Sequence, residues 1–237
     1  MKGIIDVHTH ALSSGHAYST VKENIEYAKI NGLKYYGLSD HGISMPGGPH
    51  LFYFQNLKVL PKEIDGVKIL KGIEANIIDY DGNIDVQMDK YLKELDYLIA
   101  SLHTVCLDPG TKEENTRATL NAMDHELVKI IGHPDDGRYE LDYEPIVIKA
   151  KEKKILLEVN NSSLNPNSFR PNAHENYKTL LSLCKEHRVR IILGSDAHIC
   201  YQVGIFDEAE KLLEELEFPK ELVINYNENE IKEFFEL

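Results

Sequence analysis

The sequence predicts an α/β fold in which a parallel sheet is surrounded by helices. Seven short apolar segments are each followed by a segment of helical character, and parallel strands need such crossovers. The apolar segments are hydrophobic at nearly every position, as expected for a sheet buried on both faces. Histidine or an acidic residue stands at or just after the end of most of them. Because composition does not change along the chain, we expect one domain over residues 1–237.

The predicted strands are short runs rich in β-branched and apolar residues, such as Ile4-Ile5-Asp6-Val7 at the start of the chain. Each run is closed by glycine or by polar residues, and the third is expected to end before Glu74. The seven predicted strands cover residues 4–7, 35–39, 67–73, 97–100, 128–131, 155–159 and 190–193.

The first helix is predicted over residues 20–31. Thr20 and Glu23 have capping-box spacing, and Gly32 supplies a stop signal. A loop rich in glycine and proline, residues 45–50, then breaks regular structure and suits a rim or lid. The other helices are predicted over residues 51–60, 90–95 (a weak pattern), 113–123, 143–153, 173–187, 207–216 and 228–235, with a short segment at 222–224.

The charge balance argues against some classes of partner. The chain has 26 Lys and Arg against 39 Asp and Glu, which gives a formal net charge of -13. Such a surface repels nucleic acid and anionic membranes, so we expect no long nucleic acid and no membrane as partner. Bound metals would still make one site cationic, since three divalent ions would change -13 to -7.

The cysteines and the N-terminus indicate a cytoplasmic protein. Cys106, Cys184 and Cys200 are odd in number and far apart, which argues against a disulfide framework and fits a reducing compartment. The first residues lack the basic and apolar regions of a signal peptide, and no apolar run reaches membrane-spanning length.

Histidines at strand ends are the main functional signal. His8 and His10 follow the first strand at alternate positions, and alternate residues of an extended segment point to the same side. Both rings can therefore face one metal ion. The pattern recurs along the chain, and it gives nine candidate ligands: His8, His10, His16, His41, Glu74, His103, His133, Asp196 and His198.

Nine candidates are too many for one zinc ion, whose catalytic sites usually have three protein ligands. With Glu74 bridging, they suit two or three metals. Imidazole combined with carboxylate favours zinc, iron or manganese over calcium or magnesium. A closed barrel and an open sheet both fit the strand pattern, but a barrel brings all strand ends to one rim, where such enzymes build active sites. The candidate ligands therefore favour a TIM-like barrel. Asp40 is expected either to orient the His41 ring or to cap a turn.

Polar motifs recur at the ends of the predicted strands. Five of them are Asp6-Val7-His8-Thr9-His10, Ser39-Asp40-His41-Gly42, Gly72-Ile73-Glu74-Ala75-Asn76, Gly132-His133-Pro134 and Gly194-Ser195-Asp196-Ala197-His198. These five resemble the motifs of the PHP (polymerase and histidinol phosphatase) superfamily. Two further stretches, His16-Ala17-Tyr18-Ser19-Thr20 and Glu158-Val159-Asn160-Asn161-Ser162-Ser163, resemble its YcdX-like phosphatases in particular. The likeness runs nearly end to end, although Thr104-Val105-Cys106 departs from the usual form after His103.

The resemblance implies a distorted (β/α)7 barrel that holds three divalent metal ions, usually zinc, with manganese and iron as alternatives. It implies a first metal bound by His8, His10, Glu74 and Asp196. Glu74 would bridge to a second metal, which His103 and His133 complete. The third metal would be held by His16, His41 and His198.

Such a centre implies a metal-dependent phosphatase that hydrolyses a small phosphorylated metabolite. Metal coordination lowers the pKa of water to about 7, and a metal-bound hydroxide is the expected nucleophile. Arg170 is a candidate phosphate clamp because guanidinium offers a planar fork. His50 and Asn161 are further candidate substrate contacts. The alternatives are a histidinol-phosphatase, a phosphodiesterase or nuclease on the same scaffold, and a non-catalytic binding module stabilised by metal. The oligomeric state is left open.

Overall fold

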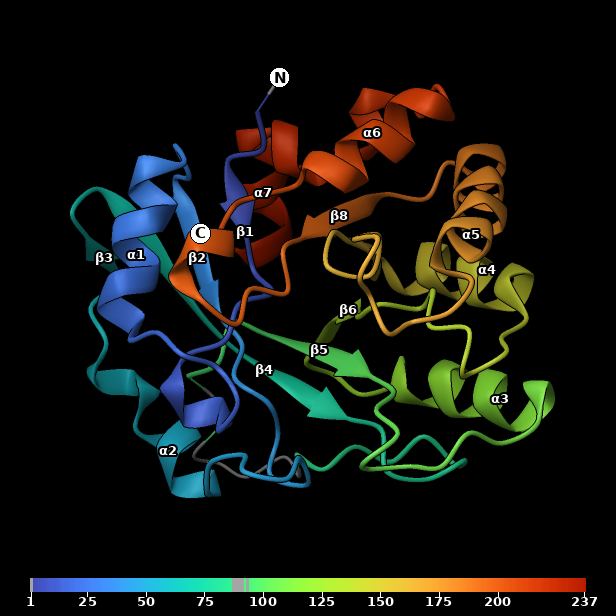
Figure 1. Ribbon diagram of the computed structural model, residues 1–237, viewed down its shortest axis with the longest axis horizontal. Coiled ribbons are helices and arrows are strands. Elements are labelled where there is room, and N and C mark those ends of the chain that lie inside the picture. The colour runs from blue at the N-terminus through green and yellow to red at the C-terminus, as the bar shows by residue number, and fades with distance from the viewer. Residues whose placement is uncertain (1, 87–91, 93) are drawn as a thin grey trace.

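A sheet of parallel strands forms the centre of the protein, and helices stand around its outside (Figure 1). The computed structural model describes residues 2–86, 92 and 94–237. Within these residues each strand pairs in parallel with the next along the path β1-β2-β4-β5-β6-β7-β8. These strands are β1 Ile5–Asp6, β2 Tyr35–Leu38, β4 Val67–Asn76, β5 Tyr97–Ser101, β6 Val128–Ile131, β7 Leu156–Asn160 and β8 Ile191–Gly194.

The sheet nearly closes into a barrel between its first and last strands. β1 and β8 are joined only beyond their ends, by a parallel bridge between Thr9 and Ala197. The buried side chain of Asn225 spans the gap lower down. Its amide donates to the carbonyls of Ile5 and Leu193 and accepts from the Leu193 N–H, at 2.8 to 3.0 Å. One side chain thus replaces the missing strand pairing, which confirms the predicted distorted barrel.

The helices follow the predicted order. Thr20 and Glu23 form the predicted capping box of the first helix, and Gly32 has a φ of 78° just after it. Residues 90–95, predicted as a weak helix, lie largely outside the described residues. The α-helices are α1 Val21–Ile30, α2 Leu51–Gln55, α3 Lys112–Ala122, α4 Tyr143–Lys153, α5 Ala173–His187, α6 Asp207–Glu215 and α7 Glu228–Phe235. Among the described residues, no helix is both long and apolar enough to cross a membrane.

Two predicted boundaries were wrong. The helix predicted over residues 51–60 divides at Asn56 into α2 and a 3-10 turn, Leu57–Val59. Strand β4 continues through Glu74 to Asn76 instead of ending at residue 73, because the whole stretch pairs with β5. A short strand that was not predicted, β3 (Glu63–Ile64), pairs antiparallel with β4.

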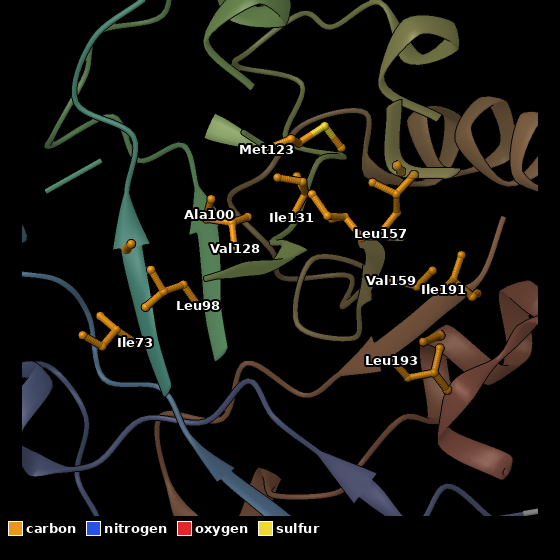
Figure 2. Close-up of a cluster of buried hydrophobic side chains, with 14 of the residues drawn as sticks. Ile73, Leu98, Ala100, Met123, Val128, Ile131, Leu157, Val159, Ile191 and Leu193 are labelled. Atoms are coloured by element: carbon orange, nitrogen blue, oxygen red, sulfur yellow. The ribbon is translucent and has the colours of Figure 1, made fainter. Parts of the chain in front are cut away.

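Two apolar layers position the site. The layer between strands and outer helices includes Ile73, Leu98 and Leu157 (Figure 2). The inner layer fills the barrel with alternate strand residues and with Ile231 and Phe235 of α7. Helix α7 therefore covers the end of the barrel where the strands begin.

Polar side chains replace apolar ones farther along the same inward faces. In β4 the inward positions run from Leu70 through Gly72 to Glu74, and in β7 from Leu156 to Glu158. Glycines make room for this layer. A Cβ on Gly194 would lie 1.9 Å from Glu158 Oε1, and one on Gly72 would lie 2.3 Å from the Tyr97 ring. The inside of the barrel is thus apolar where the strands begin and polar where they end.

Candidate metal centre

The nine predicted ligands all lie in one cluster at the ends of the strands. Thr9 separates His8 from His10, and its hydroxyl donates to the Gly37 carbonyl at 2.7 Å. Since neighbouring residues of an extended segment point to opposite sides, this contact leaves both imidazoles on the other side. Their ring centroids are 5.3 Å apart.

Glu74 stands at the centre of the cluster and is fully buried. Its Oε1 lies 3.2 Å from His8 Nε2, 3.3 Å from His103 Nε2 and 2.9 Å from His133 Nε2. Its Oε2 lies 2.7 Å from His41 Nδ1. The two oxygens thus face different sets of imidazoles, which is the arrangement that a bridging carboxylate needs.

Asp196 joins the last strand to the first. It follows β8 with a φ of 54°, and its Oδ1 lies 3.6 Å from His8 Nε2 and 3.3 Å from His10 Nε2. His198 Nδ1 lies 3.5 Å from the same oxygen. Residues almost 190 positions apart in sequence therefore meet at one point, as the barrel closure requires.

The ninth candidate, His16, completes the outer part of the cluster. Its ring centroid lies 4.8 Å from the His41 ring and 4.8 Å from the His198 ring. The preceding Gly15 has a φ of 78°, and a Cβ there would lie 2.5 Å from the Gly47 carbonyl oxygen. The predicted glycine- and proline-rich loop thus packs against the segment that carries His16.

Burial and mutual charge set the protonation states in the cluster. Burial alone would raise the pKa of Glu74, but imidazoles including His8 and His41 hold this pKa well below its usual value. Burial lowers the pKa of His10, and His41 and His198 lower it further. Burial also lowers the pKa of His103. Burial would lower the pKa of His8 too, but Glu158, Glu74 and Asp196 raise it well above its usual value. Metal binding needs neutral imidazoles and ionised carboxylates, so a metal ion at His8 would have to displace a proton.

The nitrogen and oxygen atoms of the cluster are better arranged to bind metal ions than to form hydrogen bonds with one another. Of the described residues, several in this cluster have buried polar atoms that approach one another without hydrogen-bond geometry: Nε2 of His8 and His10, both ring nitrogens of His41, and Oε2 of Glu74. Such groups cost about 1–3 kcal/mol each when left unsatisfied. Three overlapping groups place their donor atoms within 4.8 Å of one another, namely His8-His10-Glu74, His41-Glu74-His103 and His10-His41-His198.

Buried polar residues orient the imidazoles, and sequence analysis assigned most of them no role. Glu158 Oε1 lies 2.6 Å from His8 Nδ1, and its Oε2 accepts from the His133 N–H at 2.7 Å. Asn76 Oδ1 lies 2.7 Å from His103 Nδ1. A partner on one ring nitrogen fixes the direction of the other. The other nitrogen of both rings, Nε2, faces Glu74.

Asp40 acts on the cluster through Ser14. Its Oδ1 accepts from the Ser14 hydroxyl at 2.6 Å and from the Ala11 N–H at 2.7 Å. Ser14 Oγ in turn lies 3.2 Å from His10 Nδ1 and accepts from the His41 N–H at 3.1 Å. Asp40 thus supports His10 through a hydroxyl and anchors a turn.

A cavity of about 580 Å³ opens above the cluster, within the size range of small-molecule sites. Arg170 lines it, and the guanidinium donates to Asp196 Oδ2 at 3.2 Å and to Ser163 Oγ at 2.9 Å. Burial would lower the pKa of Arg170, but Asp196 and neighbouring carboxylates raise it. The cavity is lined by His16, His41, Met45, Pro46, His103, Thr104, Val105, Arg138, Ser162, Phe169, Arg170, Asp196 and His198.

The other two candidate substrate contacts do not line this cavity. His50 caps the start of α2, where its Nδ1 accepts from the Phe52 N–H at 3.1 Å. Asn161 Oδ1 accepts from the N–H groups of Glu208 and Ala209 at the start of α6. In this structure both side chains make local structural contacts.

Known proteins resemble this chain in sequence over most of its length. A model of the PHP domain family matches residues 6–162. A probable phosphatase from Clostridium novyi (strain NT) is 50% identical over 231 residues, which cover 98% of this chain and 93% of that protein. A probable phosphatase from Clostridium botulinum (strain Langeland) is 48% identical over 234 residues, which cover 99% and 95%.

Two solved structures share the fold. Histidinol phosphate phosphatase from Lactococcus lactis subsp. lactis Il1403, complexed with zinc, L-histidinol and phosphate, has a TM-score of 0.62 at 20% identity and covers 92% of this chain and 95% of its own. A probable 2-pyrone-4,6-dicarboxylic acid hydrolase from Acinetobacter baumannii has a TM-score of 0.57 at 15% identity, with 100% of both chains covered. Since the family model matches residues 6–162 and these relatives are 48% and 50% identical over almost the whole chain, the chain belongs to the PHP domain family.

Proposed function

We propose that this protein is a metal-dependent phosphoric monoester hydrolase that acts as one domain on a small phosphorylated metabolite. The observation that carries the proposal is the position of Glu74. Its two buried oxygens face five imidazoles, and several of the facing atoms make no hydrogen bond.

Three divalent ions fit the donor set. We assign the first to His8, His10, Glu74 and Asp196, the second to Glu74, His103 and His133, and the third to His16, His41 and His198. The three overlapping donor groups support several ions in place of one. Zinc is our first choice, with manganese and iron as alternatives, because imidazole and carboxylate ligands suit these metals. The zinc in the Lactococcus lactis structure agrees with this choice.

The reaction is the hydrolysis of a phosphate ester. Divalent ions supply Lewis acidity toward the phosphoryl oxygens and lower the pKa of water. The water oxygen bonds to phosphorus, the ester P–O bond breaks, and the alcohol leaves with a proton. Arg170 lies at the cavity wall with its guanidinium fixed by Asp196 and Ser163, so we assign it the role of phosphate clamp.

A histidinol-phosphatase is the second candidate function, favoured by the structural likeness to the Lactococcus lactis enzyme. A phosphodiesterase or nuclease is disfavoured by the net charge of -13, which repels a polyanion. A non-catalytic binding module is disfavoured because all nine candidate ligands are present and lie in one cluster. We assign the protein to the cytoplasm, since its three cysteines are free.

The test is a substrate panel on metal-loaded protein. Phosphomonoesters, histidinol phosphate, a phosphodiester and short oligonucleotides are assayed with the parent protein and with Arg170→Ala. We expect hydrolysis of monoesters, and we expect Arg170→Ala to raise KM while metal content stays unchanged. An absence of hydrolysis across all monoesters would refute the proposal, and unchanged kinetics of the variant would remove Arg170 from the site.

A further inference from the structure

The side chains that line the cavity above the cluster are of two chemical kinds. Four of the candidate metal ligands line it: His16, His41, His103 and His198. Apolar side chains form much of the rest, namely Met45, Pro46, Val105 and Phe169. A volume of about 580 Å³ is far more than a phosphate group fills. The apolar part of the lining is therefore available to the alcohol part of a substrate.

Phe169 is the largest apolar side chain in that lining, and it is 72% exposed. It lies between β7 and α5, in a segment without helix or strand. Val105, which also lines the cavity, is 61% exposed. Removing apolar side chains from water is favourable, so a ligand that covers them is bound more tightly. Both therefore present apolar surface to whatever enters the cavity.

Two arginines hold the Phe169 ring in place. The guanidinium carbon of Arg138 lies 4.9 Å from the ring centroid, and that of Arg170 lies 5.4 Å away. Cation–π attraction at an exposed ring is modest for each contact, and it favours this position of the ring. The ring is thus exposed to the cavity and still held, although its segment has no regular secondary structure.

The two guanidiniums are themselves held by carboxylates, that of Arg138 by Asp136 and that of Arg170 mainly by Asp196. Arg138 donates from Nε to Asp136 Oδ1 at 2.9 Å and from Nη2 to Asp136 Oδ2 at 2.5 Å. Arg170 Nε lies 4.0 Å from the same Oδ2. Because Asp136 already pairs with Arg138, this arginine offers a ligand its flat face more than a free charge. Together Phe169, Arg138 and Arg170 form an aromatic and guanidinium platform.

We propose that this platform selects phosphomonoesters whose alcohol carries an aromatic ring. The inference rests on the proposed phosphatase function and names its substrate class. The phosphate is held at the histidine cluster, and the ring of the alcohol packs on Phe169 and Val105. A sugar or polyol alcohol fits this wall less well, since its hydroxyls would lose water against apolar side chains without gaining hydrogen bonds.

The test compares esters that differ in the alcohol and share the bond that breaks. 2-Phenylethyl phosphate, 2-cyclohexylethyl phosphate and glycerol 3-phosphate are all esters of primary alcohols, so the intrinsic reactivity of the leaving group differs little. Metal-loaded parent protein is compared with Phe169→Ala and with Phe169→Tyr, which keeps the ring. Phe52→Ala is the matched control, because Phe52 is 69% exposed and does not line the cavity.

We expect the parent protein to prefer the phenyl ester over both others. Phe169→Ala should raise KM for 2-phenylethyl phosphate about three- to tenfold, with KM for glycerol 3-phosphate and the metal content unchanged. Phe169→Tyr should restore the preference, and Phe52→Ala should behave as the parent protein. A parent protein without ring preference, or a Phe169→Ala variant that changes KM equally for all three esters, would overturn the inference.

A binding assay separates this inference from the proposed function. Calorimetry measures the affinity of the metal-loaded protein for 2-phenylethylphosphonate and methylphosphonate, which cannot be hydrolysed at the P–C bond. The platform is supported if the parent protein binds the phenyl compound more tightly and Phe169→Ala loses this difference, even if no ester is hydrolysed. Equal binding of both compounds overturns it even if esters are hydrolysed.

Discussion

At the scale of single residues, Glu158 shows how a buried carboxylate can orient a histidine that we propose to bind metal. The carboxylate is buried in the barrel, 2.6 Å from His8 Nδ1, and it also accepts from the His133 N–H. It therefore sets which nitrogen of His8 is free to face Glu74. We regard Glu158 as a positioning residue.

Replacing Glu158 with Gln removes the charge and keeps the size of the side chain. We expect metal affinity to fall about 10- to 100-fold, as when the partner of a metal-bound histidine is lost. Competition with a chromophoric chelator measures this affinity without relying on catalysis. Glu186→Gln, on the exposed face of α5, is the control. A metal affinity equal to that of the parent would show that His8 needs no such partner.

At the scale of elements, α7 holds the closed end of the barrel. Phe235 is 3% exposed and packs with Ile231 and with inward-facing strand residues such as Tyr97, whose ring centroid lies 5.7 Å away. The helix is far from the histidines along the inward faces of the strands. Its packing should therefore contribute to the free energy of unfolding and have no effect on metal affinity at the proposed site.

Phe235→Ala tests this separation. Loss of a buried aromatic side chain costs about 3–5 kcal/mol of unfolding free energy, and urea denaturation with a circular dichroism readout measures it. Glu233→Ala, an exposed position on the same helix, should change stability little. Reduced metal affinity of folded Phe235→Ala protein would contradict the proposed independence of the two ends.

An ion pair at the start of α7 gives a pH-dependent contact. Glu228 pairs with Lys34 just before β2 and with Lys232 one turn along the helix. Hydrogen bonds from these two lysines lower the pKa of Glu228 to about 2. Because the pKa of Glu228 is lowered in the folded protein, its ion pairs stabilise the fold fully above the ordinary pKa of 4.5. This stabilisation is lost as pH falls through about 2.

Lys34→Gln should raise the pKa of Glu228 toward 4.5, and an NMR titration of the side-chain carboxyl carbon would measure it. Because Glu228 is exposed, we expect little change in overall stability. Lys22→Gln, at an exposed ion pair on α1, should leave the Glu228 pKa unchanged. A Glu228 pKa that stays near 2 in Lys34→Gln would show that Lys232 alone lowers it.

At the scale of the whole molecule, the barrel brings nine residues that are spread along the sequence together at one site. The sequence was sufficient to predict the parallel sheet, because buried strands are apolar on both faces and helices separate them. It was also sufficient to predict the nine clustered residues, since histidine is unusual directly after a buried strand. Parallel strands in a barrel bring those positions together.

Other features could not be predicted because their sequence signals are ordinary. Glu158 stands within an apolar strand, and only the strand's orientation shows that it faces inward. Asn225 closes the barrel from a 3-10 turn near the C-terminus, which no periodicity marks. Arg138 lines the cavity because it pairs with Asp136. Nothing in the sequence around it distinguishes it from an arginine on the solvent-exposed surface. Such contacts depend on tertiary packing.

Metal stoichiometry tests the central claim most directly. Mass spectrometry should measure the divalent ions in protein whose phosphomonoesterase activity is assayed on the same preparation, alongside Glu74→Gln. We expect about three ions per chain in the active parent protein. We expect Glu74→Gln to lose metal and activity together, because both of its oxygens face the imidazoles. Full activity in a preparation that holds no more than about one ion per chain, or in metal-free Glu74→Gln, would contradict the account.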